Sequence, residues 1–234
     1  MVGTPTLEII ATSVEDALAI ERGGADRLEV VAAMADDGLL PDTELVRRLR
    51  DAVTLPLRVM LRSRPGFGTD ARELAALCRA AERLRTLGVA GFVFGFLTQD
   101  GRLDLAAMLA LHSASGGGRW TLHRAFDQVV DIREAWLTCQ ELPGLDAVLS
   151  AGSRAGIGDG LARLCERAAW QTGSLRWLAG GGLRLEHLPA LQAAGITQFH
   201  SGRAVRRGGS WDGPVDAGLV RQWKAALGGA SEIP

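Results

Sequence analysis

Short apolar runs alternate along the chain with longer stretches in which apolar residues recur at the spacing of one helix face. The short runs predict strands at residues 6–10, 27–31, 57–61, 91–94, 119–123, 147–150, 175–179 and 198–200. The longer stretches predict helices near residues 14–23, 42–52, 71–87, 104–113, 132–141, 156–170, 184–194 and 216–226. Strands bounded by helices indicate βαβ units and a parallel sheet. Because eight such units close a (β/α)8 TIM-type barrel, we expect that fold, with a doubly wound open sheet as the alternative.

A weak internal repeat supports the barrel. A glycine follows the predicted helix before every second strand, at Gly24, Gly88, Gly144 and Gly195. Glycine just beyond a helix permits the left-handed turn that ends it. The chain of 234 residues contains no long Pro/Gly linker, and a barrel of this kind has about 250 residues. We therefore expect a single domain over residues 1–234, with residues 228–234 as a disordered tail.

Composition narrows the class of protein. The formal net charge is -1, so no general basic field attracts nucleic acid. No apolar run approaches the roughly 20 residues of a membrane span. The first ten residues lack the basic and apolar regions of a signal peptide. We therefore expect a cytoplasmic protein that binds neither nucleic acid nor a membrane.

Two residue types limit the chemistry. Lys224 is the only lysine and lies in a predicted helix, which argues against Schiff-base and pyridoxal-phosphate enzymes. The chain has no tyrosine, so no tyrosine acts as a general acid.

Cys78, Cys139 and Cys165 lie far apart in predicted helices and form no zinc pattern. They are expected to be structural thiols.

The segment WTLHRAFD, residues 120–127, carries the strongest functional signal. A buried strand runs directly into His123, Arg124 and Asp127. In parallel α/β proteins, ligands bind beyond the carboxyl ends of the strands. A base, a fixed cation and an acid at such an end suggest a catalytic site.

Carboxylates interrupt two other predicted strands. Glu8 lies in TLEII and Glu29 in RLEVV. Burying a carboxylate without a partner is costly, so each is a candidate general base or metal ligand. A structural ion pair is the alternative, with Arg27 or Arg58 as the partner of Glu29.

The remaining strand ends carry cations and glycine-rich turns. Arg62 and Arg64 flank a Gly/Pro-rich loop and would suit a carboxylate or phosphate. His200 ends the eighth strand, where a group titrating near neutrality is useful. Turns after strands six to eight offer backbone N–H groups to an anion. The candidate anion-binding residues there are Ser150, Gly152, Gly180, Gly181, Gly182, His200, Ser201 and Gly202.

The chain resembles the CutC family of copper homeostasis proteins over about residues 6–205. The resemblance rests on LEIIATSVEDALAIERGGADRLEV, LRSRPG, TLHRAFD, the SAGS and AGGG turns, and FHSG. It implies a cytoplasmic (β/α) barrel that commonly forms homodimers, and a role in copper homeostasis through copper(I) binding. The family residues that it places here are Glu8, Glu29, Arg62, Arg64, His123, Arg124, Asp127 and His200.

The copper prediction meets a chemical difficulty in this chain. Copper(I) prefers thiolate and thioether ligands, and family members often carry cysteines near the ends of the first two strands. Here those positions are Ile10, Ala11, Val31 and Ala32. The residues themselves therefore do not establish a metal or cofactor. Copper(I) is expected on the resemblance alone.

Two other functions stay open. The first is a lyase- or isomerase-type enzyme for a small anionic or phosphorylated substrate. Glu29 or Glu8 would be its base, His123 the acid partner, and Arg62 with Arg124 would stabilise developing charge. A hard divalent metal held by Glu8, Glu29 and His123 is a variant of this function. The second is a binding or interaction protein, because a barrel fold does not determine function.

Overall fold

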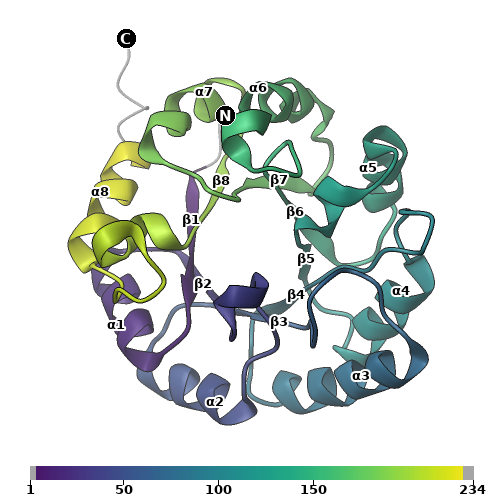
Figure 1. Cartoon of the computed structure of the whole chain (residues 1–234). Coiled ribbons are helices and arrows are strands. Elements are labelled where there is room, and N and C mark those ends of the chain that lie inside the picture. The colour runs from purple at the N-terminus through teal and green to yellow at the C-terminus, as the bar shows by residue number, and fades with distance from the viewer. Residues whose placement is uncertain (1–3, 229–234) are drawn as a thin grey trace.

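Eight parallel strands form a closed barrel in the computed structural model, which describes residues 4–228. The strands follow one another in chain order around an inner ring, with the helices outside them (Figure 1). They are β1 Thr6–Ala11, β2 Arg27–Val30, β3 Leu57–Met60, β4 Gly91–Phe94, β5 Trp120–Leu122, β6 Leu145–Ser150, β7 Arg176–Ala179 and β8 Gln198–Ser201. The predicted (β/α)8 barrel is confirmed, and the open sheet is wrong because β1 pairs with β8.

A helix follows each strand. The α-helices are α1 Val14–Gly23, α2 Thr43–Ala52, α3 Ala71–Arg85, α4 Leu105–Ala114, α5 Ile132–Gln140, α6 Ile157–Arg167, α7 Leu188–Ala193 and α8 Ala217–Gly228. Short 3₁₀ helices are η1 Met34–Asp36, η2 Arg124–Gln128, η3 Ala168–Trp170, η4 Leu185–His187, η5 Arg203–Val205 and η6 Arg207–Gly209. No helix among the described residues is long and apolar enough to cross a membrane. Of the expected disordered tail, all but Gly228 lies outside the described residues.

Local sequence explains where these helices begin and end. Asp70 precedes α3, and its carboxylate accepts a hydrogen bond from the backbone N–H of Glu73. Asp131 does the same for Glu134 at the start of α5, as expected of aspartate at an N-cap. The glycines that the repeat singled out, Gly24, Gly88, Gly144 and Gly195, all have positive φ. They permit the chain to turn from a helix toward the next strand.

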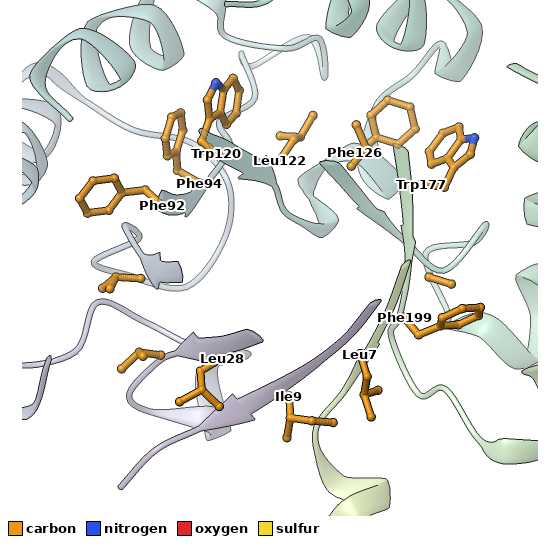
Figure 2. Close-up of a cluster of buried hydrophobic side chains, with 14 of the residues drawn as sticks. Leu7, Ile9, Leu28, Phe92, Phe94, Trp120, Leu122, Phe126, Trp177 and Phe199 are labelled. Carbon is orange, nitrogen blue, oxygen red and sulfur yellow. The ribbon is translucent and has the colours of Figure 1, made fainter. Parts of the chain in front are cut away.

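The main apolar core lies between the strands and the helices. Side chains such as Leu7, Ile9 and Phe199 point away from the barrel axis toward this layer (Figure 2). Phe94 stacks on Trp120 with ring centroids 4.2 Å apart. Successive side chains of a strand point to opposite faces of the sheet. Because these apolar side chains face the helices, the residues between them face the barrel interior.

The barrel interior contains two small apolar clusters and several buried polar groups. Arg58 donates to Thr121 and to Asp146 across the barrel. Glu8 is 1% exposed and Glu29 is 3% exposed. Because burial of charge without a partner is costly, these interior groups are expected to interact, and their partners define the site.

Candidate functional site

A cavity of about 830 Å³ opens at the carboxyl ends of the strands. Its charged lining residues are five arginines and two carboxylates, which makes its walls positive. They are Arg62, Arg124, Arg154, Arg184, Arg203, Glu29 and Asp37. Apolar side chains such as Met60, Phe67 and Trp211 line it as well. The composition fits a small ligand with both an anionic group and a less polar body.

Glu29 is the one predicted carboxylate that lines this cavity. Its Oε2 lies 3.4 Å from Nε2 of His200. Burial raises the pKa of Glu29 to about 7, even though the charge of His200 opposes that increase. A carboxylate that changes charge near neutral pH is suited to act as a general base.

Glu8 lies beneath the cavity and does not line it. Its carboxylate accepts a hydrogen bond from Nε of Arg27 and lies 2.8 Å from Nδ1 of His200. Burial alone would raise its pKa, but Arg27 and then His200 outweigh burial and hold the pKa of Glu8 well below its usual range. Glu8 therefore stays ionised and paired, so the two strand carboxylates differ in role.

His123 presents an unused hydrogen-bond donor at the cavity. Its Nδ1 accepts a hydrogen bond from the backbone N–H of Ala125 at 3.2 Å, which places the proton of the neutral ring on Nε2. That Nε2 is buried and has no hydrogen-bond partner among residues 4–228. Burial and the nearby charge of Arg62 lower the pKa of His123 to about 3. His123 is therefore neutral at pH 7 and can donate to a bound ligand.

Arg62 lines the cavity, but its guanidinium is largely occupied. It donates to the backbone carbonyls of Gly38 and Gly66, and to that of Asp36. Arg62 was expected to bind a carboxylate or phosphate together with Arg64, but in the structure it is a fixed positive charge near His123. Arg64 lies outside the cavity, where its half-exposed side chain pairs with two carboxylates at the start of α3.

Arg124 and Asp127 act as a linked pair. Arg124 lines the cavity, and its Nε donates to Asp127 at 3.0 Å. Asp127 also accepts hydrogen bonds from Oγ of Ser150 at 2.6 Å and from the N–H of Ala151 at 2.9 Å. Asp127 is buried and does not line the cavity. Its contacts hold Arg124 and the turn after β6 together.

The glycine-rich turns are partly used within the fold. The N–H of Gly180 donates to the carbonyl of Ser150, and the carbonyl of Gly181 accepts from Ile157. The N–H of Gly152 donates to Oγ of Ser150, and Gly152 does not line the cavity. Gly181 and Gly182 do line it. The turns after β6 and β7 thus shape the cavity more than they offer free donors to it.

The end of β8 contributes a second unpartnered group. Ser201 is 3% exposed and lines the cavity. Its Oγ has no hydrogen-bond partner in the part of the chain that the structure describes. Gly202 also lines the cavity, and a Cβ on this glycine would collide with Trp211. Buried polar atoms are nearly always paired. Ser201 Oγ and His123 Nε2 together therefore mark where a ligand would complete the hydrogen bonding.

Three arginines of the cavity were missed at the sequence level. Arg154, Arg184 and Arg203 were not among the predicted site residues, and an arginine in an exposed loop usually faces solvent. A signal was nevertheless present, because each of the three glycine-rich turns contains one of them, in SAGSRAG, AGGGLR and HSGRA. All three are exposed cavity-lining residues.

The described residues contain no cluster of three or more His, Cys, Asp or Glu placed to hold a metal ion. Glu8 and Glu29 converge on His200 and not on His123. The structure therefore does not bring together Glu8, Glu29 and His123, the three residues of the divalent site considered from sequence. No cysteine is among the described residues that line the cavity, and burial raises the pKa of Cys139 to about 12.

Comparison with known proteins gives a consistent result. The model of the CutC family matches residues 6–205. A CutC family protein of Klebsiella pneumoniae strain 342 is 37% identical over 197 residues, which are 83% of this chain and 78% of the relative. A CutC family protein of Salmonella typhimurium is 35% identical over 201 residues, 85% and 80% of the two chains. The crystal structure of the putative copper homeostasis protein CutC from Streptococcus agalactiae superposes with a TM-score of 0.79 at 22% identity, covering 85% of this chain and 98% of that one.

Proposed function

The chain belongs to the CutC family, and we propose that it is an enzyme that removes a proton from a carbon next to a carbonyl group in a small anionic substrate. One observation carries the proposal. Glu29, a carboxylate with a pKa near neutrality, faces the same cavity as the unpartnered Nε2–H of neutral His123. A base and a hydrogen-bond donor for the developing enolate oxygen are the two groups that such a reaction requires.

Each step of this reaction has a candidate residue. Glu29 would take the proton as the C–H bond breaks, and the electron pair would move onto the carbonyl oxygen. The Nε2–H of His123 would donate a hydrogen bond to that oxygen. The fixed charge of Arg62 lies near enough to lower the pKa of His123, so it would also stabilise an enolate beside the ring. Returning the proton from Glu29 to a neighbouring carbon that bears a hydroxyl group, while the hydroxyl proton moves to the former carbonyl oxygen, gives isomerisation.

Arginines at the cavity mouth support an anionic substrate. Arg154, Arg184 and Arg203 come from the turns after β6, β7 and β8. Guanidinium groups bind carboxylate and phosphate through paired N–H donors. The anion would thus be held by side chains at the mouth, with the reacting carbon deeper in the cavity near Glu29.

Copper(I) binding fits the site less well. The soft atoms at the cavity are the thioethers of Met34 and Met60, and the three cysteines belong to helices on the outside of the barrel. Copper(I) prefers soft thiolate or thioether ligands, and no thiolate is among the described residues that line the cavity. The donor set at the strand ends is oxygen, imidazole and guanidinium, which suits anion chemistry.

Hydrogen exchange with solvent tests the proposal. A panel of hydroxy-aldehyde and hydroxy-ketone phosphates would be incubated with the protein in D₂O, and loss of the proton next to the carbonyl followed by ¹H NMR. At least one compound should exchange, and Glu29→Gln should slow exchange by about 100-fold or more. Arg64→Ala is the control, because Arg64 lies outside the cavity. Equal exchange in wild type and Glu29→Gln across the panel would contradict the proposal.

A further inference from the structure

We propose that His200, held by Glu8, is a positioning residue that orients Glu29 and keeps it available as the base. The inference rests on the proposed function, because it assigns Glu29 the role of base. It concerns three side chains from neighbouring strands of the barrel, β8, β1 and β2. Glu29 and His200 reach the cavity, whereas Glu8 lies beneath them.

The geometry places the imidazole between two carboxylates. Nδ1 of His200 lies 2.8 Å from Oε1 of Glu8, and Nε2 lies 3.4 Å from Oε2 of Glu29. Because the two ring nitrogens face different carboxylates, one ring orientation satisfies both. Glu8 in turn is fixed by Arg27. The strand pairing supports this arrangement, since Glu8 lies opposite Arg27 on β2 and opposite His200 on β8.

The charges around His200 favour its imidazolium form. Burial alone would lower the pKa of His200, but Glu29 and Glu8 together outweigh burial and Arg27, so its pKa is raised. A protonated His200 hydrogen-bonds Glu8 through Nδ1. Its positive charge also forms an ion pair with Glu29 through Nε2, which stabilises the ionised form of Glu29.

The surroundings of Glu29 make His200 its main stabilising charge. Burial and Glu8 disfavour the ionised carboxylate, whereas His200, Arg27 and Arg62 favour it, and His200 has the largest effect of these three. Arg27 is paired with Glu8, and Arg62 is occupied by backbone carbonyls. Without the imidazolium, Glu29 would be protonated at neutral pH and could not take a proton from substrate.

A titration of the free protein tests this inference without any substrate. Glutamate carboxyl carbons would be labelled with ¹³C, and the Glu29 signal assigned by its loss in Glu29→Gln. In wild type the signal should titrate with a midpoint near 7. In His200→Asn the midpoint should rise by about 1–3 units, because a favourable charge is removed. His112→Asn is the control, since His112 contacts the carbonyl of Gly118 and does not line the cavity.

His200→Gln provides a second variant in case His200→Asn does not fold, which circular dichroism would show. An unchanged Glu29 midpoint in a folded His200 variant would overturn the inference and leave the proposed function standing. A raised midpoint together with no hydrogen exchange in wild type would support the coupling and contradict the proposed function. If the inference and the proposed function are both correct, the pH below which hydrogen exchange slows should be higher in the His200 variants than in wild type.

Discussion

Oε2 of Glu29 lies 3.4 Å from Nε2 of His200, inside a barrel whose first strand supplies a second carboxylate to the same imidazole. The two carboxylates nevertheless differ in proton affinity. Glu8 is held ionised by Arg27, whereas burial raises the pKa of Glu29 to about 7. Pairs of titratable groups whose environments separate their pKa values are typical of acid–base sites.

Replacing His123 should change how stability depends on pH. The folded pKa of about 3 lies below the ordinary value of 6.5, so the unfolded chain takes up a proton first as pH falls. The stability is fully present above pH 6.5 and is lost between 6.5 and 3. From pH 7 to pH 5, wild type should therefore lose about 2 kcal/mol more than His123→Gln. Urea unfolding at both pH values measures this, and equal losses would show that His123 is not buried as a neutral group.

The sequence was enough to predict which titratable residues are buried at the site. It was not enough to predict which of them has a raised or lowered pKa. His123 and Glu29 stood out because polar residues interrupt apolar strands. Which carboxylate keeps a low pKa depends on Arg27, which approaches Glu8 through strand pairing. Strand periodicity says that Glu8 and Arg27 face the interior, but it does not say which partner each side chain selects there.

Asp127→Asn should weaken both the fold and anion binding. The carboxylate accepts hydrogen bonds from Ser150, Ala151 and Arg124, and an amide cannot accept all three. We expect a loss of about 2–4 kcal/mol in the free energy of unfolding, together with weaker binding of inorganic phosphate in calorimetry. Asp51→Asn alters an exposed ion pair with Arg47 and should change stability by less than about 0.5 kcal/mol. Similar effects of the two substitutions would contradict the structural role of Asp127.

Two glycines of α6 offer a matched pair of substitutions. A Cβ on Gly160 would overlap the carbonyl of Ala151 in the turn after β6, whereas a Cβ on Gly158 would meet nothing within 4 Å. Gly160→Ala should therefore destabilise the protein by about 1–3 kcal/mol. Gly158→Ala should stabilise it by about 0.4–1 kcal/mol, because alanine favours the helix. Thermal unfolding of both variants tests this, and equal changes would mean that α6 does not approach the turn so closely.

Copper(I) affinity should not depend on the cysteines. Cys139 is buried with a pKa raised to about 12, and burial also raises the pKa of Cys78 and Cys165. Since thiolates are the metal-binding form, the wild type and a variant with Cys78→Ser, Cys139→Ala and Cys165→Ser should compete equally with a copper(I) chelator. Markedly tighter binding by the wild type would contradict the donor-set argument.

The glycine-rich turns show a further limit of sequence reasoning. Their position after strands six to eight was predicted. However, Gly180 and Gly181 form backbone hydrogen bonds with Ser150 and Ile157 and not with a ligand. The cavity instead gains Arg154, Arg184 and Arg203 from the same turns. A turn motif indicates where the chain bends, but the hydrogen bonds made by its backbone depend on neighbouring turns that are distant in sequence.

A crystal structure with 2-phosphoglycolate would test the central claim most directly, because its planar carboxylate resembles the enediolate of a phosphorylated hydroxy-carbonyl compound. We predict the carboxylate within about 3 Å of Nε2 of His123 and adjacent to Glu29, at a pH where one of the two carboxyls is protonated. The phosphate should lie against Arg154, Arg184 or Arg203. Binding elsewhere, or an empty cavity at saturating concentration, would contradict the assignment of this cavity as an active site.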